Sequence, residues 1–160
     1  MAQMREILFR GKTEDGEWVE GFYLVRKLRY KGDKSFMFER ATISTGIIES
    51  SGGFGERTEC LEFEVIPETV GQYTGLTDKN GKKIFEGDII SEKPPMNEIA
   101  YIGYVAYDEE AAVWRFMINN DTKFNGVLLG TYSRSYTVIG NIHDNPELLK
   151  GDKNDKNNNL

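Results

Sequence analysis

Hydrophobic and polar residues alternate along much of this chain, a pattern typical of β-strands that bury one face. Residues 60–66 show it most clearly, because apolar side chains there alternate with Glu62 and Glu64. Short segments rich in glycine, proline or asparagine separate the apolar runs and predict turns. The expected strands are residues 5–10, 17–25, 36–43, 60–66, 83–90, 99–107, 112–118 and 136–142.

The segment Val70–Ile90 carries the strongest local signal. Asn80-Gly81 predicts a two-residue hairpin with a type I′ turn, because both central residues of that turn need positive φ. The strand after the turn contains Gly87-Asp88, a tight corner at which the Asp88 carboxylate is expected to accept hydrogen bonds from backbone N–H groups. Val70–Ile90 is therefore expected to anchor the fold and not to form a chemical site.

The succession of short strands predicts a mainly β protein with a small barrel or sandwich architecture. The strand order of the C-terminal half is similar to that of small SH3-like barrels, in which short strands curl to remove their edges. Asp144 or Asn145 is expected to cap a short C-terminal helix that begins with Pro146–Leu149. This analogy concerns the fold and carries no function.

At 160 residues the chain is long enough to bury a substantial core. We expect a single domain over residues 1–149, built from two β-rich halves, residues 5–66 and 70–149, with a junction at Pro67–Thr69. The sequence leaves open whether the halves are separate domains. The tail, residues 150–160, is rich in asparagine, aspartate and lysine and is expected to be disordered.

The composition is typical of a folded globular protein that is soluble in water, since 39% of the residues are hydrophobic and 29% are charged. No apolar run approaches the roughly 18 residues needed to cross a bilayer. The first residues lack the apolar stretch of a secretory signal. A cytoplasmic location without a membrane partner is therefore expected.

The net charge of −6 is distributed unevenly. Residues 41–110 contain five basic and fourteen acidic residues, whereas residues 26–34 form a basic cluster. A nucleic-acid binder usually shows a basic stripe, which the protein as a whole lacks, so nucleic acid is the less favoured partner. The cluster is interpreted either as a charged edge strand that prevents edge-to-edge association or as a surface for phosphates or an acidic partner. Its basic residues are Arg26, Lys27, Arg29, Lys31 and Lys34.

Aromatic side chains are the second candidate for a binding surface. Residues 101–116 contain five of them on adjacent expected strands. On an open sheet face they would stack on bases or grip a peptide, and inside a small barrel they would form the core. The pattern assigns most of them to the core and leaves Tyr101, Tyr107 and Tyr132 undecided. Tyr101 and Tyr107 are therefore added to the basic cluster as candidate interaction residues.

Catalytic and metal-binding constellations are not visible in the sequence. Cys60 is the only cysteine and His143 the only histidine, which excludes a cysteine-rich or histidine-rich metal site. Asp108-Glu109-Glu110 lacks the spacing of a calcium loop and is expected to be a solvated turn. We therefore expect no catalytic residue, no metal and no cofactor.

Three blocks of the sequence resemble the YopX family of phage and prophage proteins and occur in the family's order. They are MREILFR at residues 4–10, VGQYTGLTDKNGKKIFEGDII at residues 70–90 and YTVIGNIHDNPELL at residues 136–149. Together they span almost the whole chain up to Leu149. The resemblance implies a small, largely β, oligomeric accessory protein of phage origin in a host cell. It brings no established activity and no catalytic residues.

The preferred functional hypothesis is a non-enzymatic phage accessory protein that self-associates and acts through contacts with host or phage proteins. The acidic balance, the edge strands and the family resemblance support this hypothesis. The alternative is a nucleic-acid-binding module that uses residues 26–34 and nearby aromatic side chains. An enzyme is the least favoured class, because no acid–base pair or activated nucleophile is visible.

Overall fold

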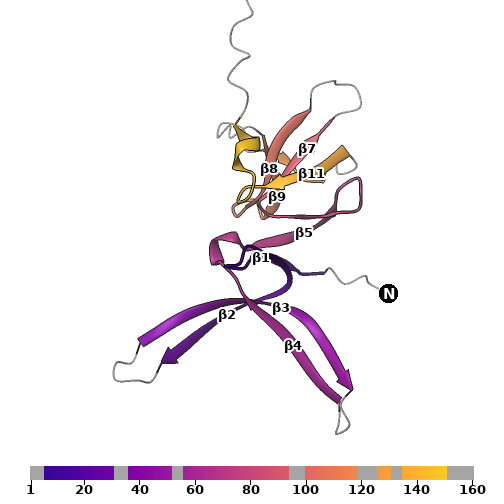
Figure 1. Cartoon of the computed structure of the whole chain (residues 1–160). Coiled ribbons are helices and arrows are strands. Elements are labelled where there is room, and N and C mark those ends of the chain that lie inside the picture. The colour runs from indigo at the N-terminus through magenta and orange to yellow at the C-terminus, as the bar shows by residue number, and fades with distance from the viewer. Residues whose placement is uncertain are drawn as a thin grey trace, which may run out of the picture. The chain divides into compact units, whose positions relative to one another are not determined.

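The structure is a computed structural model of the chain, and it describes residues 6–30, 36–51, 56–93, 100–118, 126–130 and 135–150. Within these ranges the chain forms antiparallel strands and short 3₁₀ turns, and none of these residues is in an α-helix (Figure 1). The mainly β class is therefore confirmed. No helix in the described part has the length and apolarity needed to cross a membrane. Residues 52–55, Tyr132 and the tail after Lys150 lie outside the described residues.

The chain divides into two compact units, residues 1–73 and residues 74–160, and the division falls within one strand, β5. The elements of the N-terminal unit are β1 (Phe9–Lys12), β2 (Trp18–Tyr30), β3 (Phe36–Ser51), β4 (Glu56–Glu64), the 3₁₀ turn η1 (Pro67–Thr69) and the beginning of β5 (Gly71–Thr77). Those of the C-terminal unit are the end of β5, β6 (Lys83–Phe85), β7 (Asp88–Glu92), β8 (Tyr101–Asp108), β9 (Val113–Ile118), β10 (Val127–Leu128), β11 (Tyr136–Asn141) and the 3₁₀ turn η3 (Pro146–Leu149).

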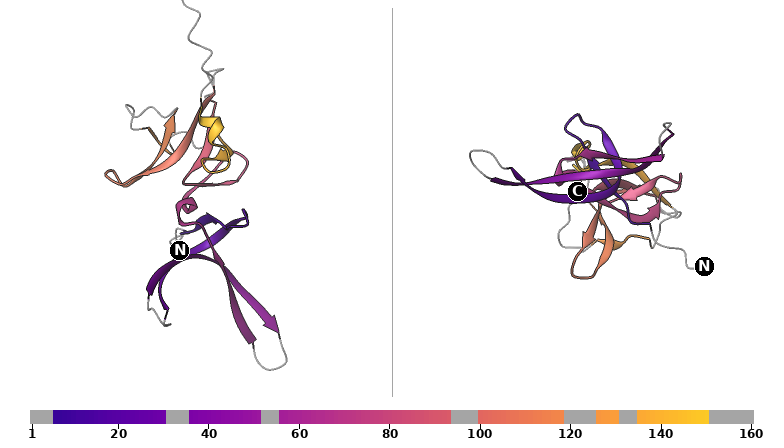
Figure 2. Two further views of the ribbon diagram at one scale, coloured as in Figure 1. Left: turned by 60° about the vertical axis from the view of Figure 1, so that its left-hand side comes forward. Right: turned by 90° about the horizontal axis from the view of Figure 1, so that it is seen from below.

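In the N-terminal unit the strands are ordered β4-β3-β2-β1, and the beginning of β5 lies beside β1. The long strand β3 has two partners in succession: its first half pairs with β2 up to Ser44, and its second half pairs with β4. The unit therefore contains a pair of ribbons of two strands each, β2–β3 and β3–β4. They diverge from a shared region near Thr42 (Figures 1 and 2).

The core of the N-terminal unit lies where these ribbons meet. Ile43, Ala41 and Val65 are buried there, and partly buried apolar residues of neighbouring strands pack against them. Gly21 is required at this crossing, because a Cβ there would lie 2.0 Å from the carbonyl oxygen of Ser44. Trp18 is only half-buried, and the guanidinium of Arg10 lies 4.6 Å from the centre of its ring.

The C-terminal unit contains a five-stranded antiparallel sheet with the order β10-β9-β8-β7-β11. Its core consists of fully buried apolar residues, with the rings of Phe116 and Tyr136 packed edge to face at 5.7 Å. The core residues are Ile84, Ile90, Val105, Phe116 and Tyr136. The end strands β10 and β11 each have one strand neighbour in this sheet, which is not closed in the described part. The expected SH3-like barrel is therefore not confirmed.

The turn at Asn80-Gly81 differs from the type I′ hairpin that the sequence predicts. Gly81 has a φ of +82°, but Ala112 is the only non-glycine residue with positive φ in the described part of the chain. Asn80 therefore does not have the conformation that type I′ requires. The Asp78 carboxylate explains the difference, because its Oδ1 accepts hydrogen bonds from the N–H groups of Asn80 and Lys82 and closes a longer loop.

The prediction of a C-terminal helix is also wrong. Pro146–Leu149 forms a single 3₁₀ turn, and Asn145 makes no side-chain capping bond to it. The Oδ1 atom of Asn145 instead accepts a hydrogen bond from the N–H of Asn141 at 3.4 Å, which directs the side chain back toward β11. A turn of four residues without a side-chain cap is too short to form an α-helix.

Candidate functional site

The clearest unusual surface of the N-terminal unit is the part of β2 that follows Gly21. Phe22 is 60% exposed and Val25 50%, and Leu24 is 41% exposed. Because successive strand residues point to opposite faces, Phe22 and Leu24 share one face of the β2–β3 ribbon and Val25 lies on the other. Large apolar side chains are thus open to solvent on both faces of one ribbon, which marks an interaction surface more often than a monomer surface.

The same part of β2 has an open strand edge. Strand β1 pairs with β2 only from Trp18 to Gly21, and β3 occupies the opposite edge from Phe22 to Tyr30. Beyond Gly21 no described strand lies on the edge of β2 that faces away from β3. Strand β4, at the end of the same sheet, likewise has β3 as its one described neighbour. Open edges of this kind present backbone groups that are able to pair with another strand.

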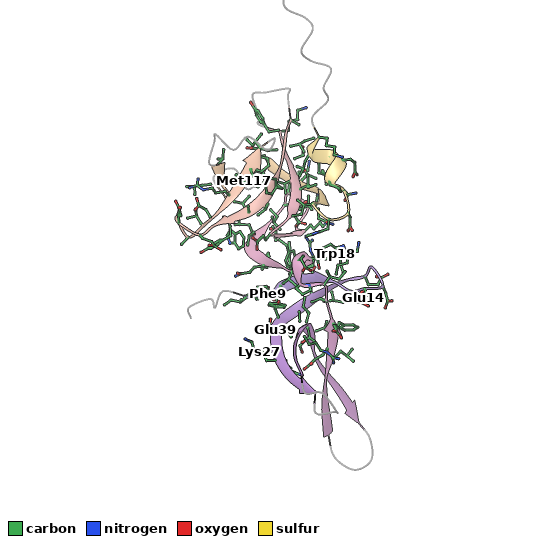
Figure 3. All side chains as sticks on the ribbon, turned by 90° about the vertical axis from the view of Figure 1, so that its left-hand side faces the viewer. Phe9, Glu14, Trp18, Lys27, Glu39 and Met117 are labelled. Carbon is green, nitrogen blue, oxygen red and sulfur yellow. The ribbon has the colours of Figure 1, made fainter. Side chains whose placement is uncertain are left out.

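Ion pairs occupy the basic cluster that the sequence singled out. Arg26 donates to a Glu62 carboxylate oxygen at 2.6 Å, and the Lys27 ammonium lies 3.3 Å from Glu39 (Figure 3 shows Lys27 and Glu39 side by side). The side chains remain accessible, with 50% of Arg26 and 70% of Lys27 exposed. The side-chain placement of Arg29 is outside the description, and Lys31 and Lys34 lie wholly outside the described residues.

Thr42 occupies the middle of this surface. It pairs in register with Leu24 of β2 and with Glu64 of β4, and its side chain shares their face of the sheet. It is 3% exposed, and its hydroxyl oxygen has no hydrogen-bond partner among the described residues. Burial of a hydroxyl group without a hydrogen-bond partner costs free energy. Such a group is unusual in the centre of a surface that is otherwise rich in charged residues.

An acidic pocket lies at the beginning of the second ribbon. Its volume of about 500 Å³ is within the range of pockets that bind small ligands. The lining comes from the β1–β2 turn and from the end of β4: Thr13, Glu14, Asp15, Glu62, Phe63 and Glu64. Four carboxylates around one exposed aromatic ring favour a basic and partly apolar partner.

The two candidate tyrosines lie in the C-terminal unit, near opposite ends of β8. Tyr101 is 38% exposed and Tyr107 is 43% exposed, so both lie at the surface. The Tyr107 ring packs against Trp114 with ring centres 4.9 Å apart, whereas Tyr101 pairs in register with Glu92. The strand therefore does not bring the two tyrosines together into one binding surface.

Tyr107 lines a pocket of about 350 Å³ together with the Asp108–Arg115 ion pair. Arg115 Nε donates to Asp108 Oδ2 at 2.5 Å, and Asp108 Oδ1 accepts from the N–H groups of Glu110 and Ala111. The hydrogen bond from Ala111 and then the one from Arg115 lower the pKa of Asp108. The acidic turn is thus organised by hydrogen bonds within the chain. Among the described residues no three metal-ligating side chains are grouped.

Three carboxylates of the C-terminal unit are buried. Asp88 is 1% exposed and accepts a hydrogen bond from the N–H of Phe85 at 2.8 Å, which confirms the role predicted for it. Asp78 is 5% exposed and bonded to several backbone N–H groups. Burial raises the pKa of Glu92, and a hydrogen bond to Ser135 opposes that effect. The sequence did not indicate burial of Asp78 or Glu92.

The remaining candidates are dispersed. His143 is exposed in the segment between β11 and η3, and its N–H donates to the side chain of Asn141. Cys60 belongs to β4, but its side-chain placement is outside the description. The exposed pair Phe22 and Leu24 was missed by the sequence analysis. The available signal was the uninterrupted apolar run Phe22–Val25, which does not alternate and so cannot bury all its members on one face of a sheet.

These features define a mainly β protein whose N-terminal unit exposes apolar side chains on a two-stranded ribbon. The family model described as YopX protein matches residues 9–150, and the chain belongs to the YopX family. The structure is also similar to the crystal structure of protein EF1440 from Enterococcus faecalis, with 28% sequence identity and a TM-score of 0.53. That similarity covers 91% of this chain and 99% of the other. No curated protein matches the sequence.

Proposed function

We propose that this protein is a non-enzymatic accessory protein of phage or prophage origin, which self-associates and acts through protein contacts in the cytoplasm of the host cell. The observation that supports the proposal best is the exposure of Phe22, Leu24 and Val25 on both faces of the β2–β3 ribbon. An isolated two-stranded ribbon is marginally stable in water, so a partner that covers its apolar residues would stabilise it.

Nucleic-acid binding is the alternative, and the ion pairs of the basic cluster count against it. Arg26 and Lys27 each have a carboxylate partner, so a phosphate would have to compete with Glu62 and Glu39 for them. The acidic pocket beside the cluster would repel a phosphate backbone further. A host or phage protein with a basic and apolar surface fits the same residues better.

The test of self-association is the molar mass of the protein in solution, measured by light scattering after size-exclusion chromatography over a range of concentrations. The variant Phe22→Ser/Leu24→Ser is expected to weaken self-association about tenfold or more, because it removes exposed apolar contacts. The matched control is Val127→Ser/Leu128→Ser, which removes an exposed apolar pair from β10 of the C-terminal unit. A native protein that stays monomeric at all concentrations contradicts the proposal.

A further inference from the structure

We infer that copies of this protein associate head to tail, with the open edge of β2 in one copy paired to the open edge of β4 in the next. This inference rests on the proposed self-association and specifies its geometry. Within each copy both edges lie in the N-terminal unit, and each has β3 on its other side over residues 22–30 of β2 and along β4. Each edge therefore offers a row of backbone groups to a strand of another chain.

The charges of the two strands identify the occupant. Residues 22–30 of β2 contain three basic residues and no acidic residue, whereas β4 contains four glutamates and one arginine. The formal charges of these two strands, +3 and −3, are equal and opposite over nine residues each, and Arg26, Glu62 and Glu64 also take part in exposed ion pairs within one copy. Two copies of β2 or two copies of β4 would repel each other, so a symmetric contact between identical edges is disfavoured. The pairing of β2 with β4 brings strands of opposite formal charge together.

Within one copy a basic side chain of β2 already contacts an acidic side chain of β4 across β3. Arg26 of β2 and Glu62 of β4 form an ion pair at 2.6 Å, although 36 positions separate them in the sequence. Both side chains stay partly exposed, at 50% and 31%, so a neighbouring copy is able to reach them. The acidic pocket at the end of β4 adds the exposed ring of Phe63, against which apolar residues of β2 such as Leu24 would pack.

The proposed contact is heterologous, because two different surfaces meet. Such contacts repeat from copy to copy, and they build a closed ring where the rotation between copies closes and an open filament where it does not. In either product the side chains of the adjoining β4 lie beside Phe22 and Leu24 on the same face and reduce their exposure. A symmetric dimer is not expected from this geometry.

A charge exchange between the two strands tests the pairing. The first variant, Arg26→Glu/Lys27→Glu, makes β2 acidic, and the second, Glu62→Lys/Glu64→Lys, makes β4 basic. Each variant alone is expected to lose self-association by about tenfold or more, since its two edges then carry charges of the same sign. An equimolar mixture is expected to assemble again, because the acidic β2 of one variant meets the basic β4 of the other.

The mixture separates the pairing from an effect on folding. Both variants disrupt the ion pair between Arg26 and Glu62 within each copy, and mixing does not restore it. Recovery of assembly in the mixture is therefore an effect between copies. The control Lys79→Glu/Lys93→Glu makes the same change in net charge as the first variant at exposed sites of the C-terminal unit. It is expected to assemble like the native protein.

Every outcome decides between the two proposals. If the native protein is monomeric, self-association itself fails. If both variants assemble as well as the native protein, or if the mixture stays dissociated, self-association holds but the pairing of β2 with β4 is wrong. If circular dichroism shows that a variant is unfolded, the native protein is titrated with salt from about 50 to about 500 mM NaCl, where screening weakens a charge-driven contact. An assembly that persists unchanged through the titration overturns the pairing.

Discussion

The carboxylate of Asp78 accepts a hydrogen bond from the backbone N–H of Val138 at 3.2 Å, across 60 positions of the sequence. Its other oxygen accepts from the N–H groups of Asn80 and Lys82 at 2.8 and 2.9 Å. One buried side chain thus closes the turn between β5 and β6 and fastens that turn to β11. No local pattern connects these residues, because β11 lies in a distant part of the sequence.

Replacement of this carboxylate is expected to destabilise the C-terminal unit. Asp78→Ala leaves three partly buried backbone N–H groups without their acceptor, and the free energy of unfolding is expected to fall by about 3 kcal/mol. Urea denaturation followed by the fluorescence of Trp114, in a Trp18→Phe background, measures it, because the protein has two tryptophans. The control is Glu109→Ala, at an exposed site of the same unit. Equal stability of the two variants would contradict the assigned role.

The stability of the C-terminal unit is expected to fall in acid partly through Asp78. Burial alone raises the pKa of Asp78, but the hydrogen bonds from backbone N–H groups outweigh it and hold the pKa below its usual 3.8. The folded state therefore binds this proton less readily than the unfolded state, so the stabilisation is present above pH 3.8 and is lost as the pH falls through the lower folded pKa. Unfolding free energies measured from pH 6 to pH 2 should depend less on pH in Asp78→Asn than in the native protein. Asp108, whose pKa is also lowered, is unchanged in both proteins, so the difference isolates Asp78.

Glu92 is expected to behave in the opposite way. Burial raises its pKa above the usual 4.5, so the folded state binds the proton more readily than the unfolded state. Its ionisation therefore destabilises the folded protein increasingly as the pH rises from 4.5 through the folded pKa. Glu92→Gln, which has no charge to bury, should be more stable than the native protein at pH 7, and the advantage should disappear below pH 4.5. Thermal unfolding at both pH values checks this, and a variant that is less stable at pH 7 contradicts it.

Local sequence patterns predicted the strands of this protein better than their partners. The alternation in residues 60–66 placed Glu62 and Glu64 on one face, and the register of β4 with β3 agrees with that. The pattern placed one strand at residues 36–43, whereas β3 continues to Ser51 and serves two ribbons in succession. Glycine and serine in its second half are poor β-formers, and pairing with β4 overrides that preference.

The position of the basic cluster along the chain was predictable from the sequence, but its ion pairs were not. The basic cluster in residues 26–34 was evident from composition, and the structure places its beginning in an exposed ribbon. That Arg26 would meet Glu62 was not evident, because contacts between distant residues depend on the topology of the sheet. The predicted type I′ turn at Asn80-Gly81 was wrong for a similar reason, because the carboxylate of Asp78, outside the dipeptide, determines the conformation of the turn.

The strength of nucleic-acid binding distinguishes the two functional hypotheses. If the basic cluster serves protein contacts, a fluorescently labelled DNA duplex should bind weakly near physiological salt, because the acidic residues beside the cluster repel a phosphate backbone. Arg26→Glu/Lys27→Glu should then change that weak affinity little. A phosphate-binding cluster would behave differently: each lost cation would reduce the slope of log K against log salt by about one. Fluorescence anisotropy across a salt series measures both quantities. Tight binding with a steep salt dependence that the variant abolishes would falsify the protein-contact proposal and assign residues 26–34 to nucleic acid.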